Sequence, residues 1–255
     1  MIHNAGVPYL SREKIEQTAS KVIAWIAVER LERPSETPVA HIIERLVKEQ
    51  RLLFKCDADL GHSRRGRKIL GAFDFSARSI FIDPVLVDAK RTARFRFTLA
   101  HELGHFVLHR RRMLDWPALD AAPSRVDDDR VELHFLKRRS RIRTPRQWLE
   151  WQANYFASCL LMPAATVQQA IADLQGEAGV TRRLGRLYLD DQPTNRVMYQ
   201  KALYRLQDTY QVSRSVVVIR LRELALVDDR RTFGAQHIAR LFSEEGETTG
   251  SSQTS

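Results

Sequence analysis

Two histidines and a glutamate in this chain have the types and the spacing that can hold and use a metal ion. Residues 101–105 read His-Glu-Leu-Gly-His, and the stretch before them, 94–100, contains no proline or glycine that would interrupt a helix. Residues four apart in a helix are offset by about 40° and about 6 Å, so His101 and His105 share a face and can ligate one ion. Glu102 stands beside them. Its carboxylate can take a proton from a water molecule that zinc has acidified to a pKa of roughly 7.

A second segment supplies a candidate for the third ligand. Catalytic zinc sites use three protein ligands and keep a fourth position open. Glu150 lies on another predicted helix, and Asn154 follows it one turn later on the same face, where its amide can hydrogen-bond a zinc-binding imidazole. We therefore predict one zinc ion per chain, held by His101, His105 and Glu150.

His109 lies one further turn along the first helix and shares the face of the other two histidines. It stands about 12 Å from His101 along the helix axis, too far for both imidazoles to join one tetrahedron easily. We predict that His109 has a structural or cleft-lining role instead.

The sequence around these residues resembles the ImmA/IrrE metallopeptidase family of bacterial and phage proteins, which is built on a small gluzincin-type core. The resemblance rests on residues 96–105 and on the pattern Glu-x-x-Ala-Asn-x-Phe-Ala-x-x-Leu-Leu-Met-Pro over residues 150–163. It implies zinc ligation by His101, His105 and Glu150 and a general-base role for Glu102. It also implies cleavage of a regulatory protein, such as a helix-turn-helix repressor or an antitoxin-like regulator. The stretch between the two motifs is longer than the family leads us to expect, so we expect an unusual rim around the cleft.

Composition indicates a soluble protein with more than one unit. The N-terminus lacks a basic start and an apolar run, and no stretch approaches the roughly 18 apolar residues of a membrane span. Together with only two cysteines, Cys56 and Cys159, this favours a cytoplasmic location. The net charge is +10 and the isoelectric point is near 10.0. Its basic clusters are consistent with phosphate contacts or with the steering of an acidic partner, and equally with solubility alone.

Apolar periodicity predicts the first helices of the chain. Residues 12–31 carry an amphipathic stripe with Ser11 as the cap. A second helix is expected to begin at Pro38 with Thr37 as its cap.

Helix signals also frame the two site segments. The first site helix is expected from about residue 92 to His109. The second starts at a capping box formed by Thr144 and Gln147, and Pro163 closes it.

Short β-prone runs predict a small sheet beside the first site helix. Residues 68–75 and 79–83 read as a hairpin, and residues 52–56 read as a third strand. We expect the strand over 80–82 to be an edge that binds an extended substrate through main-chain hydrogen bonds. The fold class is therefore α+β, with a small, mostly antiparallel sheet packed against the helices that carry the His-Glu-x-x-His motif and Glu150.

The last third of the chain has a helix-turn-helix outline. A helix leads into a turn at 210–212, and Ser213 caps a second helix. This pattern is consistent with a DNA-reading unit and with a two-helix packing unit, and the sparse basic residues favour packing or partner binding. We predict a metallopeptidase domain over 1–175, a helical unit over 196–240 and a disordered tail over 243–255.

The predicted function is zinc-dependent endopeptidase activity, in which Glu102 takes the proton of the attacking water and passes it to the leaving amine. His134 and Tyr199 are candidates for a second donor to the oxyanion. The alternative is a zinc-stabilised regulator that binds DNA or protein without turnover. The presence of Glu102 favours the peptidase over the non-catalytic regulator, because a structural zinc site needs no carboxylate beside its first ligand and is usually closed by four protein ligands.

Overall fold

The computed structural model describes residues 10–57, 59–63, 66–87, 92–113, 124–127 and 144–231, and for 111–113 and 124–127 it describes only the course of the backbone. The fold is α+β, as predicted. Its helices are α1 (Arg12–Ala27), α2 (Val39–Lys48), α3 (Thr92–Met113), α5 (Pro145–Leu161), α6 (Ala164–Glu177), α7 (Pro193–Tyr210) and α8 (Arg214–Glu223), with short 3-10 helices at Val28–Leu31 and Pro84–Leu86. Its strands are β1 (Leu53–Lys55), β2 (Ile69–Asp74), β3 (Ser79–Ile82), β4 (Ser124–Asp127), β5 (Leu187–Leu189) and β6 (Val227–Asp229).

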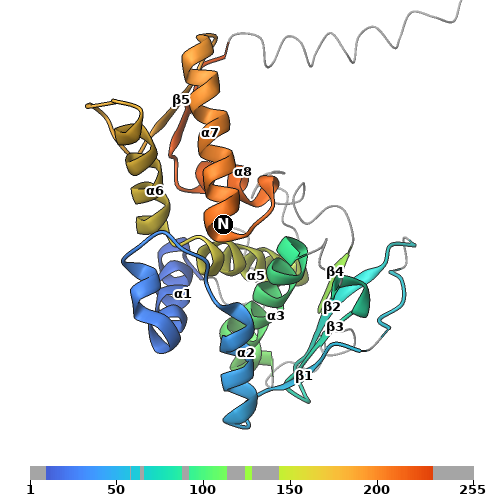
Figure 1. The fold of residues 1–255 in the computed structure, drawn as a ribbon. Coiled ribbons are helices and arrows are strands. Elements are labelled where there is room, and N and C mark those ends of the chain that lie inside the picture. The colour runs from blue at the N-terminus through green and yellow to red at the C-terminus, as the bar shows by residue number, and fades with distance from the viewer. Residues whose placement is uncertain are drawn as a thin grey trace, which may run out of the picture.

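The larger sheet lies on one side of α3, and α3 and α5 cross in the middle of the molecule (Figure 1). Its strand order is β1-β3-β2-β4. The predicted hairpin is confirmed, because β2 and β3 pair antiparallel. β2 and β4 also pair antiparallel, whereas β1 and β3 run parallel. The sheet is therefore mostly antiparallel, as expected from the sequence.

The prediction that residues 80–82 form an edge strand is wrong. β3 lies between β1 and β2 and is hydrogen-bonded on both sides, so its backbone has no free side to offer an extended peptide. Among the strands that the structure describes, β1 and β4 are the outer ones of this sheet.

Most of the predicted helix starts are confirmed by their caps. The Ser11 hydroxyl accepts a hydrogen bond from the Lys14 amide at the start of α1, and Thr144 and Gln147 form the expected capping box of α5. The predicted cap of α2 is wrong. Pro38 occupies the N-cap position, and the Thr37 hydroxyl donates instead to the Leu160 carbonyl oxygen at 2.8 Å. Thr37 therefore ties the start of α2 to the end of α5.

The close crossing of α3 and α5 depends on a glycine within the motif itself. A Cβ atom at Gly104 would lie 3.1 Å from the Ala153 carbonyl oxygen and 3.1 Å from the Phe156 ring. Those separations are tighter than ordinary van der Waals contact, so a larger residue would push the helices apart. Gly104 thereby allows the two site helices to approach each other.

A buried arginine connects α3 to distant parts of the chain. The Arg96 guanidinium forms an ion pair with Glu36 and donates to the carbonyl oxygens of Thr37 at 3.0 Å and Gln211 at 3.1 Å. The residues at the C-terminal end of α7 and before α2 are thus held against the helix that carries the motif.

The C-terminal helices pack onto the body of the protein. The Ser213 hydroxyl caps α8, as predicted, and α8 buries Val216, Val217, Ile219, Arg220 and Leu221. One hydrophobic core extends from Ile15 in α1 to Leu226, just before β6. The division into units over 1–175 and 196–240 stays a prediction, because a shared core does not test where each unit could fold alone.

Arg220 is a fully buried residue of α8. Its guanidinium forms an ion pair with Glu16 at 2.7 Å, donates to the Met162 carbonyl oxygen at 2.8 Å and lies 3.8 Å from the Glu223 carboxylate. Its charge therefore faces the protein interior, where it cannot contact a phosphate.

We expect the Arg220→Ala substitution to lower the free energy of unfolding by roughly 3–5 kcal/mol, because it leaves two partly buried carboxylates without their cation. Arg222→Ala, two residues further on α8 and exposed, is the matched control and should change stability by less than about 0.5 kcal/mol. Urea unfolding of both proteins measures the difference. Equal transition midpoints would show that the buried ion pair does not stabilise this fold.

Several sequence predictions lie outside the described residues. These are the disordered tail over 243–255, His134 and the charged stretch that contains it, and part of the basic clusters. No helix in the described part of the chain has both the length and the apolar character that a membrane crossing requires.

Candidate active site

Three of the predicted site residues converge where α3 crosses α5. The Nε2 atoms of His101 and His105 lie 3.0 Å apart, and the Glu150 Oε2 atom lies 3.3 Å from the first and 3.8 Å from the second. Both imidazoles are buried, while the Glu150 side chain is 28% exposed. The three atoms thus form a small triangle that opens toward solvent on the side of Glu150.

The side-chain amide of Asn154 orients the imidazole of His101, as predicted from the sequence. The His101 Nδ1 atom lies 2.8 Å from the Asn154 Oδ1 atom. An amide oxygen only accepts hydrogen bonds, so Nδ1 carries the proton and Nε2 keeps its lone pair. That lone pair points toward His105 and Glu150.

The imidazole of His105 is oriented by a chain of two further side chains. The His109 Nε2 atom lies 3.0 Å from the Gln152 Oε1 atom, and the His109 Nδ1 atom lies 3.1 Å from the His105 Nδ1 atom. Gln152 accepts, so His109 donates from Nε2 and accepts at Nδ1 the proton of His105. His105 is thereby left with its Nε2 lone pair free, which is the arrangement a metal ligand requires.

The predicted structural role of His109 agrees with this arrangement. Burial, and secondarily the nearby charge of His105, lower the pKa of His109 to about 3. A neutral imidazole can both donate and accept, and this hydrogen-bonded chain requires both.

Glu102 is fully buried, and neither of its carboxylate oxygens has a hydrogen-bond partner among the described residues. One of its oxygens and one ring nitrogen from each of His101 and His105 lie within 4.8 Å of one another. A buried carboxylate without a partner is costly. A cation with a water molecule beside Glu102 would supply what this side chain lacks.

A glycine in the neighbouring strand makes room for Glu102. A Cβ atom at Gly71 in β2 would lie 2.9 Å from the Glu102 Oε1 atom and 2.5 Å from the Thr98 Cγ2 atom. The strand can therefore approach the motif helix closely, and the Glu102 side chain is enclosed between them.

The pKa values of the two carboxylates in the site are shifted in opposite directions from their usual range. Burial, and then the charge of Glu150, raise the pKa of Glu102 well above its usual range. Burial also acts to raise the pKa of Glu150, but the interaction of its carboxylate with the neighbouring imidazoles of His101 and His105 outweighs that effect and holds the pKa well below the usual range. The site therefore pairs an ionised carboxylate with one that binds a proton readily.

The donor set fits a zinc ion. With zinc-to-nitrogen distances of about 2.0–2.1 Å, the ligand atoms of a tetrahedral site lie about 3.3 Å apart. The three separations in the triangle lie close to that length. Burial lowers the pKa of His105, which favours the neutral imidazole that a metal binds. The buried His-Glu-His group could bind a metal ion, and His101, His105 and Glu150 have the geometry of three ligands.

A comparison with models of known protein families shows to which family the chain belongs. A family model for peptidases, Peptidase_M78, described as the IrrE N-terminal-like domain, matches residues 71–222, more than half of the chain. The chain belongs to this family. None of the curated proteins compared with the chain matches it.

Membership of Peptidase_M78 agrees with the resemblance seen in the sequence. The matched range contains the motif of α3, the Glu150 segment of α5 and most of α8. The chain is accordingly a peptidase-type hydrolase, and a buried group able to bind a metal lies inside the matched domain.

Sequence reasoning missed Gly71 and Gln152, which support the site from β2 and α5. Gln152 lies two residues after Glu150, but its contact with His109 depends on the crossing of α3 and α5, so no local sequence signal pointed to it. The predicted oxyanion donor Tyr199 lies on α7. There burial raises its pKa, while the charges of Arg222, Arg231 and Arg214 act to lower it. Its electrostatic neighbours are thus C-terminal residues and not the motif histidines.

We expect Gly71→Ala to impair the site and the fold together. The added methyl group would stand too close to Thr98 and Glu102, and overpacking of this kind costs roughly 1–3 kcal/mol. Gly176→Ala is the control, because its Cβ atom would meet no heavy atom within 4 Å and its helix should be unchanged or slightly stabilised. Thermal unfolding and peptidase activity check both variants, and a fully active, fully stable Gly71→Ala protein would contradict the close approach of β2 to Glu102.

Proposed function

We propose that this protein is a zinc-dependent endopeptidase that cleaves a specific regulatory protein, such as a helix-turn-helix transcriptional repressor. The observation that carries the proposal is the convergence of two imidazole nitrogens and the Glu150 carboxylate beside the buried carboxylate of Glu102, which has no hydrogen-bond partner among the described residues. A structural zinc site would need no such carboxylate.

The proposed chemistry assigns one task to each residue. A zinc ion held by His101, His105 and Glu150 would acidify a water molecule and polarise the scissile carbonyl. Glu102 accepts the proton of the attacking water and delivers it to the leaving amine. Asn154 and His109 hold the two imidazoles in the tautomers that leave their Nε2 atoms available. Whether zinc or manganese serves in the cell is a question of metal supply as well as of ligands.

A regulatory protein is the proposed substrate because the family resemblance implies it, and the charge of the protein is compatible with it. A net charge of +10 speeds encounter with an acidic protein surface. We also propose a cytoplasmic location, which suits the free thiols of Cys56 and Cys159.

DNA binding by the helix-turn-helix outline is not favoured. A recognition helix must expose the residues that read the groove, whereas α8 buries Arg220 and most of its apolar residues. Arg214, which is exposed at the start of α8, donates a hydrogen bond to Gln200 at 2.6 Å. We propose that α7 and α8 pack and support partner binding.

Incubation of the purified protein with candidate helix-turn-helix repressors tests the proposal. We expect one repressor to yield two fragments whose masses sum to that of the substrate plus one water, with no cleavage when a chelator is present. Unfolded casein is the control for bulk digestion and should stay largely intact. Tight binding of a repressor or of DNA without any hydrolysis would favour the non-catalytic zinc-stabilised regulator instead.

A further inference from the structure

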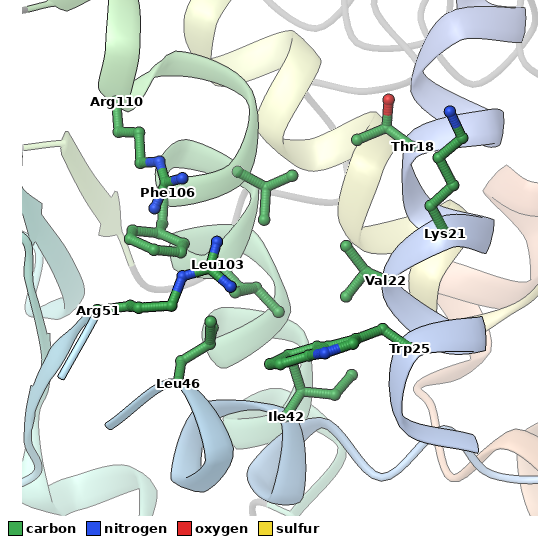
Figure 2. Close-up of a pocket in the computed structure, with 11 residues that line it drawn as sticks. Thr18, Lys21, Val22, Trp25, Ile42, Leu46, Arg51, Leu103, Phe106 and Arg110 are labelled. Atoms are coloured by element: carbon green, nitrogen blue, oxygen red, sulfur yellow. The ribbon is translucent and has the colours of Figure 1, made fainter. Parts of the chain in front are cut away.

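A second concave site lies on the far side of α3 from the metal-binding group. It is a pocket of about 260 Å³ between α1, α2 and α3. Figure 2 shows Val22 and Trp25 of α1 on one side, Leu46 and Ile42 of α2 below, and Phe106 of α3 opposite. These side chains make the walls of the pocket predominantly apolar.

The charged side chains around this pocket all carry the same sign. Lys21, Arg51 and Arg110 line it, and no acidic side chain does so among the described residues. Figure 2 shows the guanidinium groups of Arg51 and Arg110 reaching in from the side of Phe106, whereas the Lys21 side chain on the opposite side points away from them, past Thr18. An apolar pocket with a few convergent charged groups is the usual form of a small-molecule site.

Two of these cations, Arg51 and Lys21, have no strong ion pair that would prevent them from binding an anion. Arg51 forms an ion pair with Glu49 at 3.4 Å, in which both side chains are exposed, and exposed pairs of this kind contribute little. Among the described residues Lys21 takes part in no ion pair, and its side chain is exposed. A carboxylate at the mouth of the pocket can therefore compete with Glu49 for Arg51.

Aromatic groups define the apolar part of the pocket. The Arg45 guanidinium lies 4.4 Å from the centre of the Trp25 ring and donates to the Trp25 carbonyl oxygen, so the indole is held in place. The Phe106 ring packs edge to face on Phe73 at 6.1 Å. The Trp25 indole thus offers a preformed surface to a ring-shaped ligand, whereas the Phe106 ring is 2% exposed and has the Arg110 guanidinium 4.5 Å from its centre.

We propose that this pocket binds a small monocarboxylic acid with an apolar body, about the size of one aromatic ring on a short chain. The volume sets the size, because a cavity of about 150 Å³ already holds benzene and this one is larger. The cations set the charge of the ligand. The apolar walls exclude strongly hydrated anions such as phosphate, which would lose their water without enough hydrogen bonds in return.

The pocket is separate from the proposed metal site, although both use α3. Leu103 and Phe106 face the pocket, whereas His101 and His105 face Glu150. The proposal therefore holds or fails independently of the zinc peptidase activity. Carboxylates also bind zinc directly, so a test must distinguish the two locations.

Calorimetric titration with 3-phenylpropionate tests the proposal, with the neutral 3-phenylpropionamide as the matched probe. We expect saturable binding at one site per chain and roughly tenfold weaker binding of the amide, which corresponds to about 1.4 kcal/mol. We expect the affinity for 3-phenylpropionate to be the same with and without a chelator, which would show that the ligand does not bind at the metal site.

Substitutions in and beside the pocket test whether the ligand binds there. Arg51→Glu reverses one charge of the lining and should weaken binding by roughly tenfold or more, whereas Lys48→Glu, an exposed cation at the end of α2 that does not line the pocket, should leave it unchanged. Val22→Phe should fill the pocket and abolish binding without loss of the folded state. Absence of saturable binding, equal affinity for acid and amide, loss of binding on chelation, or an unchanged Arg51→Glu protein would each overturn the proposal.

Discussion

The Glu102→Gln protein is expected to keep its metal and its fold and to lose at least about a hundredfold in the rate of peptide hydrolysis, the scale of a lost general base. Glutamine has nearly the same size and fits the enclosed space beside Gly71, but its amide cannot accept the proton of the attacking water. Stability should be unchanged or slightly increased, because the substitution removes a buried carboxylate that no side chain or backbone group in the described part of the chain hydrogen-bonds.

Three measurements on the same preparation separate the roles of Glu102. Elemental analysis reports metal content, thermal unfolding reports the fold, and the initial rate of substrate cleavage reports chemistry. A Glu102→Gln protein as active as the wild type would rule out Glu102 as the base.

The His105→Ala protein is expected to lose its zinc, falling from one ion per chain to near zero after dialysis. The substitution removes one of the three converging atoms, and it also deprives His109 of its hydrogen-bond partner at 3.1 Å. Cleavage should fall to background, since both the activation of water and the polarisation of the carbonyl depend on the ion.

His41→Ala is the matched control for this loss. His41 is exposed on α2, far along the chain from the motif, and its removal should leave zinc content and activity unchanged. Stoichiometric zinc in the His105→Ala protein would show that the metal is bound elsewhere.

Much of the candidate site was predictable because its signals are local. The four-residue spacing of His101 and His105 determines their shared face on any helix. The capping box of α5 depends on Thr144 and Gln147 alone, and it confirms where the helix that carries Glu150 begins. Asn154 follows from Glu150 by one helical turn, and its contact with His101 agrees with the expectation.

The features that sequence reasoning missed depend on contacts between distant segments. Residues 80–82 were expected at an edge, but β1 adds in parallel on their far side, a pairing set by tertiary packing and not by any local pattern. The Thr37 hydroxyl bonds to Leu160, more than a hundred residues away, instead of to its own helix.

The chain from His105 through His109 to Gln152 has the same origin. It forms only because Gly104 lets α3 and α5 cross closely, and helical spacing alone could not show that a third histidine would orient the second.

Restoration of metal to the chelated protein tests the central claim most directly. Zinc is added in fractions of one equivalent to the metal-free protein, and cleavage of the identified substrate is measured at each step, with Glu102→Gln titrated alongside. We predict that activity rises linearly and stops rising at one zinc per chain, while Glu102→Gln binds the same amount of zinc and stays inactive. Activity that survives chelation, or that zinc does not restore, would contradict the assignment of His101, His105, Glu150 and Glu102 to a metal-dependent peptidase site.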